Sequence, residues 1–460
     1  MVGSPMIWLR VISLVIVCLM APALAWSETA SELSAKALDL VSPARETRKA
    51  AISFFANRGK PDAIPALILA DRFATDDRDL QGTLESLSGA KAQSWFDWMV
   101  WQEAHPEVAP FTGFDEFQAK LYRAIDSNFG LFMKPGAAHQ IRLEEIAWGG
   151  VIKDGIPALT DPRLLDAANA HYLAADDLVF GLEINGDARA YPLRIMDWHE
   201  MFNDVVGGVP VSLAYCTLCG SGILYETSVP GRSKPFVFGS SGLLYRSNKL
   251  MYDTETNSLW NQFAGRPVAG PLTGSGITLR TRPVVITTWA DWRRLHPATR
   301  VLDIETGFQR DYRPGAPYGY YFASPDLMFP TQVGKATRRP KDFVFALRSA
   351  GAERAWPLAL FAGGAVLNDK AGIADVVLIG DAATRTVRAY RTDGRTFTKG
   401  TEPEHPLADG APWQLTEDSL NGPGGKTFLR LPGHIAYWFA WSGSFGLQGT
   451  VAGEPDAGQR

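Results

Sequence analysis

The sequence predicts an α+β protein in which a β-rich module occurs twice, preceded by an all-α N-terminal domain. Residues 27–140 carry apolar side chains at helical spacing, whereas glycine, proline and short alternating runs dominate from residue 141 onward. A pattern that begins at Phe180 begins again at Phe345, 165 residues later (345 − 180). The length of 460 residues also calls for more than one ordinary domain.

Residues 1–25 are interpreted as a secretory signal peptide, with an uncleaved anchor as the alternative. Arg10 supplies a positive charge, residues 11–20 form a short apolar core, and Ala23-Leu24-Ala25 has the small residues of a cleavage site. No later stretch is long and apolar enough to span a membrane. We therefore expect a periplasmic or secreted protein with no membrane span after cleavage.

The helical domain is predicted over residues 27–140. Residues 49–74 have the spacing of two helices separated by a turn at Gly59-Lys60-Pro61, and residues 92–103 and 114–132 predict two more. Such a domain either packs as a simple helical unit or binds a protein partner. A net charge of −4 without any basic run makes nucleic acid an unsuitable partner.

The first β-rich copy is predicted over residues 141–330. Residues 180–193 have two β-like arms around Asn185-Gly186, which is typical of a hairpin with a type I′ turn. A short helix is predicted over residues 195–204, and a strand over residues 209–215 leads to the sequence Cys216-Thr-Leu-Cys219-Gly.

The second copy is predicted over residues 340–450, and residues 451–460 are predicted to be a disordered tail. Both copies keep the hairpin, its closing proline and an Asn-Asp pair. The chemistry-bearing residues differ. The shift of 165 places Gly363, Gly364 and Ala365 opposite Trp198, His199 and Glu200, and Asp381 and Thr384 opposite Cys216 and Cys219. The scaffold therefore does not need the histidine or the thiols, which favours a functional role for them.

Cys216 and Cys219 are the only cysteines outside the predicted signal peptide. A Cys-x-x-Cys turn can hold a soft metal ion, exchange thiols and disulfides, or form a structural disulfide. A metal site needs more ligands, and His199 is the preferred third ligand for copper or zinc, followed by His296. The β-like run after the turn lacks the helix start of a thioredoxin-like site.

Other polar residues within apolar motifs are candidates for the same pocket, although turn and cap hydrogen bonds also explain them. These residues are Glu200, Tyr215, Glu226, Tyr245 and Asp253. No nucleophile elbow, Walker loop or dinucleotide fingerprint occurs, so no nucleotide cofactor and no catalytic residue is predicted.

These motifs resemble the exported proteins of the domain-of-unknown-function family 3179. The resemblance covers roughly residues 141–345 and is carried by Gly149-Gly150, Ile184-Asn-Gly-Asp-Ala-Arg-Ala-Tyr-Pro-Leu193, Trp198-His-Glu200, Tyr215-Cys-Thr-Leu-Cys-Gly220, Gly239-Ser-Ser-Gly-Leu-Leu-Tyr245, Met251-Tyr-Asp253 and Ser258-Leu-Trp260. It implies a fold and a site position but supplies no activity.

Three hypotheses follow for the exported protein. The first is a Cys216/Cys219/His199 site for copper or zinc that serves metal handling or metal-assisted chemistry. The second is a thiol–disulfide redox protein that uses the same cysteines. The third is a non-enzymatic binding or scaffold module with a structural disulfide. The sequence leaves open whether the protein is an enzyme.

Overall fold

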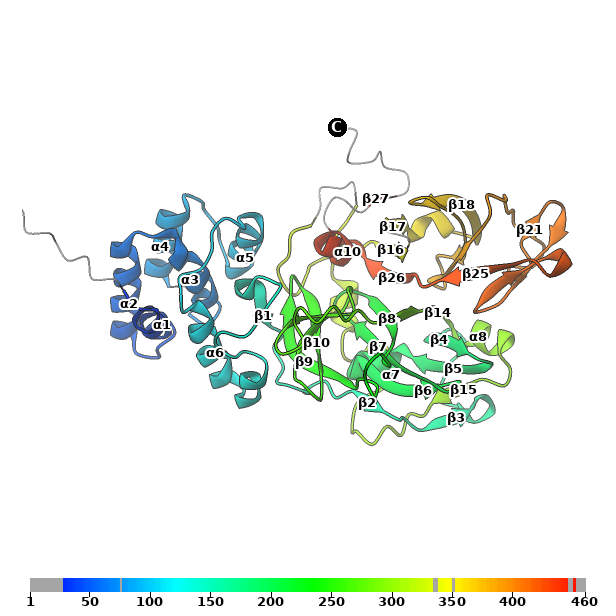
Figure 1. Cartoon of the computed structure of the whole chain (residues 1–460), viewed down its shortest axis with the longest axis horizontal. Coiled ribbons are helices and arrows are strands. Elements are labelled where there is room, and N and C mark those ends of the chain that lie inside the picture. Colours follow the sequence, from blue (N-terminus) through cyan, green and yellow to red (C-terminus); the bar gives the residue numbers. More distant parts are fainter. Residues whose placement is uncertain (1–27, 75–76, 334–337, 350–351, 446–449, 452–460) are drawn as a thin grey trace, which may run out of the picture.

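The computed structural model describes residues 28–74, 77–333, 338–349, 352–445 and 450–451. The predicted signal peptide and, apart from Val451, the predicted tail lie outside these residues. Helices occupy one end of the long axis, and β-sheets fill the rest (Figure 1). The predicted α+β class with an all-α N-terminal domain is therefore confirmed.

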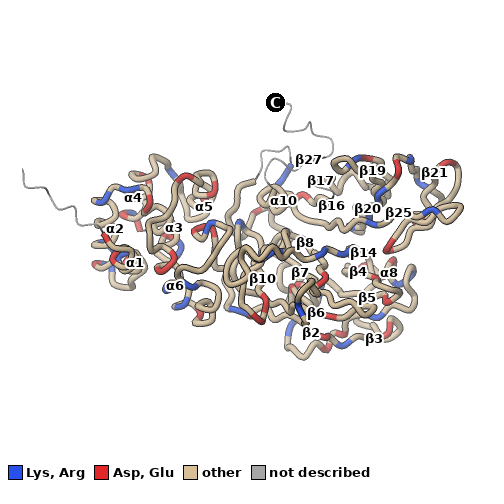
Figure 2. Tube along the Cα trace, in the orientation of Figure 1, with Lys and Arg blue, Asp and Glu red and all other residues tan. Residues whose placement is uncertain are grey.

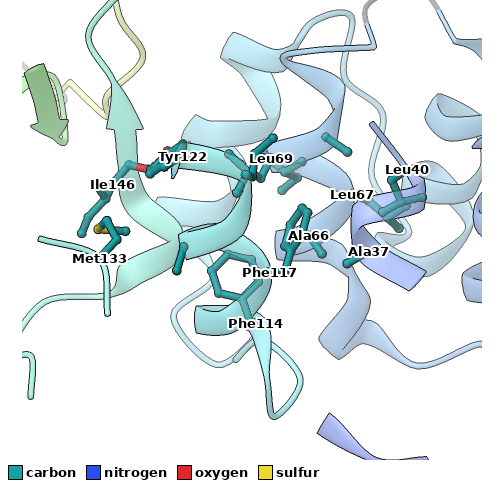
Figure 3. Close-up of a cluster of buried hydrophobic side chains, with 14 of the residues drawn as sticks. Ala37, Leu40, Ala66, Leu67, Leu69, Phe114, Phe117, Tyr122, Met133 and Ile146 are labelled. Atoms are coloured by element: carbon teal, nitrogen blue, oxygen red, sulfur yellow. The ribbon is translucent and has the colours of Figure 1, made fainter. Parts of the chain in front are cut away.

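The helical domain is built around α3, whose eight residues are all buried. Gly59 ends the preceding helix with a φ of 65°, and Pro61 begins the next turn, as the sequence predicts. Figure 3 shows Leu67 and Leu69 of α3 among the packed apolar side chains of this domain. The elements are α1 (Ala30–Asp39), α2 (Arg45–Arg58), η1 (Pro61–Ala63), α3 (Ile64–Asp71), α4 (Arg78–Ser88), α5 (Trp95–Ala104), α6 (Phe114–Ile125), η2 (Ser127–Leu131) and η3 (Leu143–Glu145).

The first β-rich region follows directly, and its strand β1 is tied to the helical domain by a hydrogen bond of 2.7 Å from Tyr122 Oη to the carbonyl of Ile146. Its elements are β1 (Ile146–Trp148), β2 (Leu159–Thr160), β3 (Leu164–Asp166), η4 (Ala167–Asn169), β4 (Leu178–Ile184), β5 (Asp187–Pro192), α7 (Leu193–His199), β6 (Met201–Val206), β7 (Val209–Cys216), β8 (Ser221–Glu226), β9 (Phe238–Tyr245), β10 (Asn248–Asp253), β11 (Leu259–Asn261), β12 (Arg266–Ala269), β13 (Thr281–Arg282), β14 (Val285–Thr288), α8 (Trp289–Leu295), β15 (Arg300–Leu302) and α9 (Gly319–Ala323).

The prediction of a helix over residues 195–204 is wrong for its second half. Helix α7 stops at His199, because Glu200 takes a left-handed conformation with a φ of 55°. Residues from Met201 onward then form β6, which pairs with β7. Sheet pairing therefore overrides the helical spacing in the second half of this segment.

The second β-rich region lies beside the first and extends to the opposite end of the molecule (Figure 1). Its elements are β16 (Phe343–Ser349), β17 (Ala352–Pro357), η5 (Leu358–Phe361), β18 (Ala365–Ala371), β19 (Ala374–Asp381), β20 (Thr386–Arg391), β21 (Leu407–Ala408), β22 (Ala411–Pro412), β23 (Gln414–Leu415), β24 (Ser419–Asn421), η6 (Pro423–Gly425), β25 (Thr427–Leu431), β26 (His434–Tyr437), α10 (Trp438–Phe445) and β27 (Thr450–Val451).

The strand registers of the two regions coincide when 165 is added to the residue number. In the first hairpin Phe180 faces Tyr191, and in the second hairpin Phe345 faces Trp356. The same shift relates the β6–β7–β8 pairings to those of β18–β19–β20. Side-chain contacts follow as well: Asn203 exchanges two hydrogen bonds with the backbone of Phe238, and Asn368 does so with Phe397.

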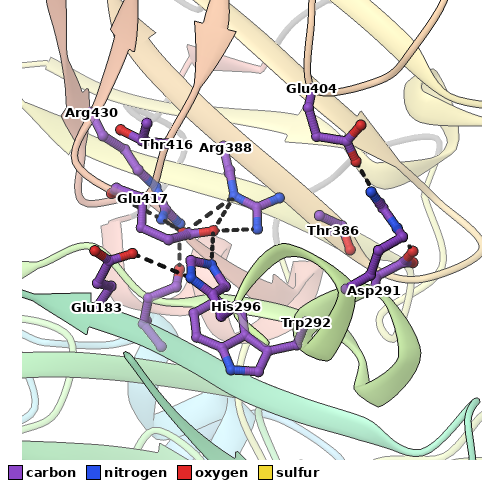
Figure 4. Close-up of polar contacts among 12 residues, drawn as sticks. Glu183, Asp291, Trp292, His296, Thr386, Arg388, Glu404, Thr416, Glu417 and Arg430 are labelled. Atoms are coloured by element: carbon purple, nitrogen blue, oxygen red, sulfur yellow. Dashed lines mark hydrogen bonds and ion pairs between the residues drawn. The ribbon is translucent and has the colours of Figure 1, made fainter. Parts of the chain in front are cut away.

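A buried polar network joins the two regions (Figure 4). The Glu417 carboxylate accepts hydrogen bonds from Arg388 and Arg430. His296 of the first region lies between Glu417, at 3.6 Å, and Glu183, at 3.3 Å. The two guanidinium groups keep the pKa of Glu417 below its ordinary range despite its burial. Elsewhere, Figure 2 shows acidic and basic residues interspersed along the chain.

Candidate functional site

The Cys216–Cys219 turn joins β7 to β8. Cys216 pairs with Ser221 at the end of the ladder, so only four residues close the hairpin. The Cys219 N–H donates to the Cys216 carbonyl at 3.1 Å, and Gly220 takes a φ of 59°. This tight geometry places the two Cα atoms 5.2 Å apart and forms a Cys216–Cys219 disulfide.

The turn is buried by segments that come much later in the chain. Cys216 is 2% exposed and Cys219 is fully buried. The Tyr437 N–H of β26 donates to the Cys219 carbonyl at 2.8 Å, and Tyr321 Oη donates to the Leu218 carbonyl at 2.8 Å. Gly220 lies against the rings of Phe343 and Tyr437, so closely that a Cβ atom there would meet the Phe343 ring at 3.0 Å.

Cys219 Sγ has two polar neighbours on the hairpin turn between β9 and β10. Asn248 Nδ2 lies 3.3 Å from the sulfur, and the Ser247 carbonyl oxygen lies 3.5 Å from it. Arg246 and Ser247 form this turn with φ values of 49° and 61°, a conformation that favours Asn and Gly. This turn places the Ser247 carbonyl and the side chain of Asn248, the first residue of β10, beside one sulfur atom.

A buried ion pair lies beside the cysteines. Glu200 Oε2 is 2.7 Å from Lys249 Nζ, and Glu200 Oε1 accepts a hydrogen bond of 2.6 Å from Thr217 Oγ1, within the turn. Lys249 Nζ also donates to Ser240 Oγ at 2.6 Å. Burial lowers the pKa of Lys249, and the Glu200 carboxylate opposes that shift. The Glu200 carboxylate therefore contacts both Thr217 of the turn and Lys249 of β10.

A second buried carboxyl group, that of Asp197, contacts the residue before the turn. Asp197 of α7 accepts a hydrogen bond of 3.1 Å from Tyr215 Oη, and Tyr215 directly precedes Cys216. Burial raises the pKa of Asp197 to about 7, whereas the hydrogen bond from Tyr215 lowers it. Asp197 can therefore hold or release a proton near neutral pH.

His199 does not join the cysteines. Its Nδ1 lies 2.8 Å from the Pro157 carbonyl and its Nε2 lies 2.6 Å from Tyr312 Oη. The carbonyl can only accept a hydrogen bond, so Nδ1 carries a hydrogen. Burial also lowers the pKa of His199.

With both ring nitrogens engaged and the two sulfurs bonded to each other, these three residues do not fit the predicted copper or zinc site. In the described part of the chain, no group of three or more His, Cys, Asp or Glu residues is arranged to hold a metal ion. Whether the protein binds a metal stays a prediction from the sequence.

Of the other predicted pocket residues, Glu200 and Tyr215 lie at the turn. The remaining four contact other groups. Glu226 pairs with Arg282, Tyr245 lies beside Glu145 and Arg246, Asp253 accepts hydrogen bonds from Trp260 and Thr256, and His296 belongs to the Glu417 network.

Sequence reasoning missed Lys249, Asn248 and Asp197. Lys249 had a detectable signal, because it is a charged residue that directly precedes the β-like run Leu250-Met-Tyr. Asn248 and Asp197 had none, since their roles depend on contacts between segments far apart in sequence.

Comparison with known proteins identifies the family. Residues 153–446 match the model of a family described as "Protein of unknown function (DUF3179)". The chain belongs to this family. The match includes the Cys216–Cys219 turn and most of both β-rich regions but leaves out the helical domain. No curated protein and no solved structure matches the chain.

Proposed function

We propose that this DUF3179 protein is a thiol–disulfide redox protein whose centre is the Cys216–Cys219 pair. The observation that carries the proposal is the surroundings of Cys219 Sγ. Asn248 Nδ2 at 3.3 Å stabilises a thiolate, and the Ser247 carbonyl at 3.5 Å can accept the hydrogen of a thiol. A disulfide sulfur has no hydrogen to donate, so the carbonyl serves only the reduced state.

The reaction is a two-electron exchange with an external dithiol. A thiolate of that dithiol attacks Cys216 Sγ, the Cys216–Cys219 bond breaks, and Cys219 leaves as a thiolate beside Asn248. The second thiol of the external dithiol then attacks the sulfur of the same dithiol that is bonded to Cys216. This bond breaks, and Cys216 leaves as a thiolate. The donor becomes a disulfide, and its two protons pass to the cysteines. With a pKa of about 7, Asp197 is suited to relay a proton near the turn.

Access to Cys216 requires movement of the covering segments. Tyr321 and Tyr437 each hold the turn by one hydrogen bond, at 2.8 Å. The burial of both sulfurs favours a second candidate function, in which the disulfide is structural and the protein is a binding or scaffold module. A disulfide that closes so short a loop contributes little stability through chain entropy, which weakens this alternative.

A disulfide persists in an oxidising compartment, which supports export to a periplasm or beyond. No described helix is long and apolar enough to cross a membrane.

The coinciding registers support an internal duplication in which only the first copy carries the redox pair. We assign the helical domain, which lies outside the family match, to binding a protein partner.

The test is reduction of the folded protein. Oxidised protein is incubated with increasing dithiothreitol, free thiols are trapped by alkylation, and circular dichroism reports the fold. The proposal expects two thiols to appear at reductant levels that leave the spectrum unchanged, and to disappear again on oxidation. Thiols that appear only together with unfolding in urea would establish a structural disulfide instead. Stoichiometric copper or zinc in the purified protein, lost in Cys216→Ser, would favour the metal hypothesis.

A further inference from the structure

A cavity of about 200 Å³ lies between the two β-rich regions. One wall comes from α8 of the first region, including Asp291 and Arg294, and the other from β18–β20 and the segment around Lys399. The residues that line this cavity include Ala365, Asp381 and Thr384, which correspond to Glu200, Cys216 and Cys219 of the first region.

The correspondence is established by backbone position. Asp381 pairs with Thr386 at the end of its ladder as Cys216 pairs with Ser221, and Arg385 has a φ of 54° where Gly220 has 59°. Phe397 pairs with Asn368 as Phe238 pairs with Asn203, so that Lys399 stands where Ser240 stands in the first region.

An ammonium group is therefore present at the same place in both regions. In the first region Lys249 Nζ reaches Ser240 Oγ and is neutralised by Glu200. In the second region the position of Glu200 is held by Ala365. Among the described residues, Lys399 Nζ donates hydrogen bonds to the carbonyl oxygens of Gly363, at 3.1 Å, and Gly364, at 3.4 Å, and forms no ion pair. Lys399 thus replaces Ser240, the residue that Lys249 Nζ contacts in the first region, and Ala365 supplies no carboxylate to pair with it.

Lys399 and Asp381 are also the two charged groups of the cavity that form no ion pair with any described residue. The other charges are matched: Arg294 pairs with Glu404 and Asp291, and Arg388 pairs with Glu417 (Figure 4). A Cβ atom on Gly364 would lie 3.4 Å from Lys399 Nζ and 3.9 Å from Asp381 Oδ2. The ammonium and the carboxylate thus flank one empty space that the glycine leaves open.

We propose that this cavity binds a small zwitterion of the α-amino acid class. The ligand's carboxylate pairs with Lys399, where Glu200 pairs with Lys249 in the first region, and its ammonium group pairs with Asp381. The hydroxyl groups of Thr384 and Thr386 supply further polar contacts at the wall. The site is independent of the redox proposal, because its contacts lie in the second region and include neither cysteine.

The test measures binding to the full-length mature protein. Ligand-observed NMR with the twenty protein L-amino acids identifies the strongest binder, and calorimetry gives its Kd. Propionate and propylamine, each with only one of the two charges, serve as probes of the pairing. We expect an amino acid to bind at least about tenfold more tightly than either single-charge probe, because each charge-assisted contact contributes a factor of about ten or more.

Three variants locate the site. Lys399→Met and Asp381→Asn are each expected to weaken binding about tenfold or more. Ala365→Glu, which restores the carboxylate found in the first region, is expected to abolish binding with the thermal midpoint kept. Lys91→Met, an exposed lysine of the helical domain, is the control that leaves Kd unchanged. The proposal is overturned if no amino acid binds, if propionate binds equally well, or if Lys399→Met and Asp381→Asn bind like the parent protein.

Discussion

The two β-rich regions differ at one corresponding hairpin turn, which joins β7 to β8 in the first region and β19 to β20 in the second. The β7–β8 turn is filled: a disulfide, the Glu200–Lys249 ion pair and the Asp197–Tyr215 hydrogen bond leave the cysteines buried. The turn between β19 and β20 has the same length and register, yet it borders a cavity. Strand pairing therefore determines the position of this hairpin end, and a few side chains determine whether it is closed or open.

The largest difference should appear when each lysine is removed. Lys249→Met leaves the Glu200 carboxylate buried and unpaired, so we expect the free energy of unfolding to fall by about 3–5 kcal/mol. Lys399→Met removes an exposed lysine that forms no ion pair with a described residue. This variant should change the free energy of unfolding by less than about 0.5 kcal/mol. Urea unfolding followed by circular dichroism measures both variants.

If Lys249→Met does not fold, the double variant Glu200→Gln/Lys249→Met is measured in its place. The double variant removes both charges and should be more stable than Lys249→Met alone. Equal losses for Lys249→Met and Lys399→Met would contradict the contrast between a closed and an open hairpin end.

Stability should also depend on pH through Asp197, whose counterpart in the second region is Ala362. The pKa of Asp197 is about 7 in the folded protein, against an ordinary value of 3.8. Between these pH values the folded state keeps a proton that the unfolded chain has released, so the free energy of unfolding falls as pH rises from about 4 to 7. Asp197→Asn should remove about 2–4 kcal/mol of this decline. Unfolding curves at several pH values measure it, and an unchanged slope in the variant would refute the assignment.

The scaffold asparagines provide a smaller comparison. Asn203 is 5% exposed and Asn368 is exposed, although each forms the same two backbone hydrogen bonds. We expect Asn203→Ala to cost about 2 kcal/mol, because it leaves buried backbone groups unpaired, and Asn368→Ala about 1 kcal/mol or less, because water replaces the side chain. Thermal unfolding of both variants tests the ranking, and a larger loss for Asn368→Ala would reverse it.

The smallest effect concerns the proposed redox pair, Cys216 and Cys219. Asn248→Ala removes the donor 3.3 Å from Cys219 Sγ, so the reduced state loses about 1 kcal/mol of stabilisation. The reduction potential should become more negative by about 20–30 mV. Equilibration with a glutathione buffer measures this potential, with Asn169→Ala at an exposed position as the control. A potential that is unchanged or more positive would remove the central support of the redox proposal.

Much of the scaffold was predictable from the sequence because its signals are local. Asn185-Gly186 predicts the β4–β5 hairpin, and both residues have positive φ. Gly59 and Pro61 predict the break between α2 and α3. The recurrence after 165 residues predicts where β16–β19 lie, since the two regions share the same alternation of apolar residues.

The candidate site was predicted only in part, because its other contacts are not local. The short spacing of Cys216 and Cys219 restricts them to one turn, and Glu200 follows a helix that ends beside it. His199 has the sequence context of a ligand, but its side chain points to Pro157 and Tyr312. His199 and Glu200 are consecutive in the sequence at the end of α7, so their side chains point in different directions. Sequence spacing alone therefore does not show which one faces the cysteines.

The cover of the cysteine turn has a consequence for biogenesis. The backbone N–H of Tyr437 that holds Cys219 lies 218 residues further along the chain (437 − 219). A chain that emerges from its N-terminus presents the β7–β8 hairpin long before β26 can pair with β16 over it. Both thiols are therefore uncovered in a chain that lacks its C-terminal strands, and the turn becomes buried only when β26 pairs with β16.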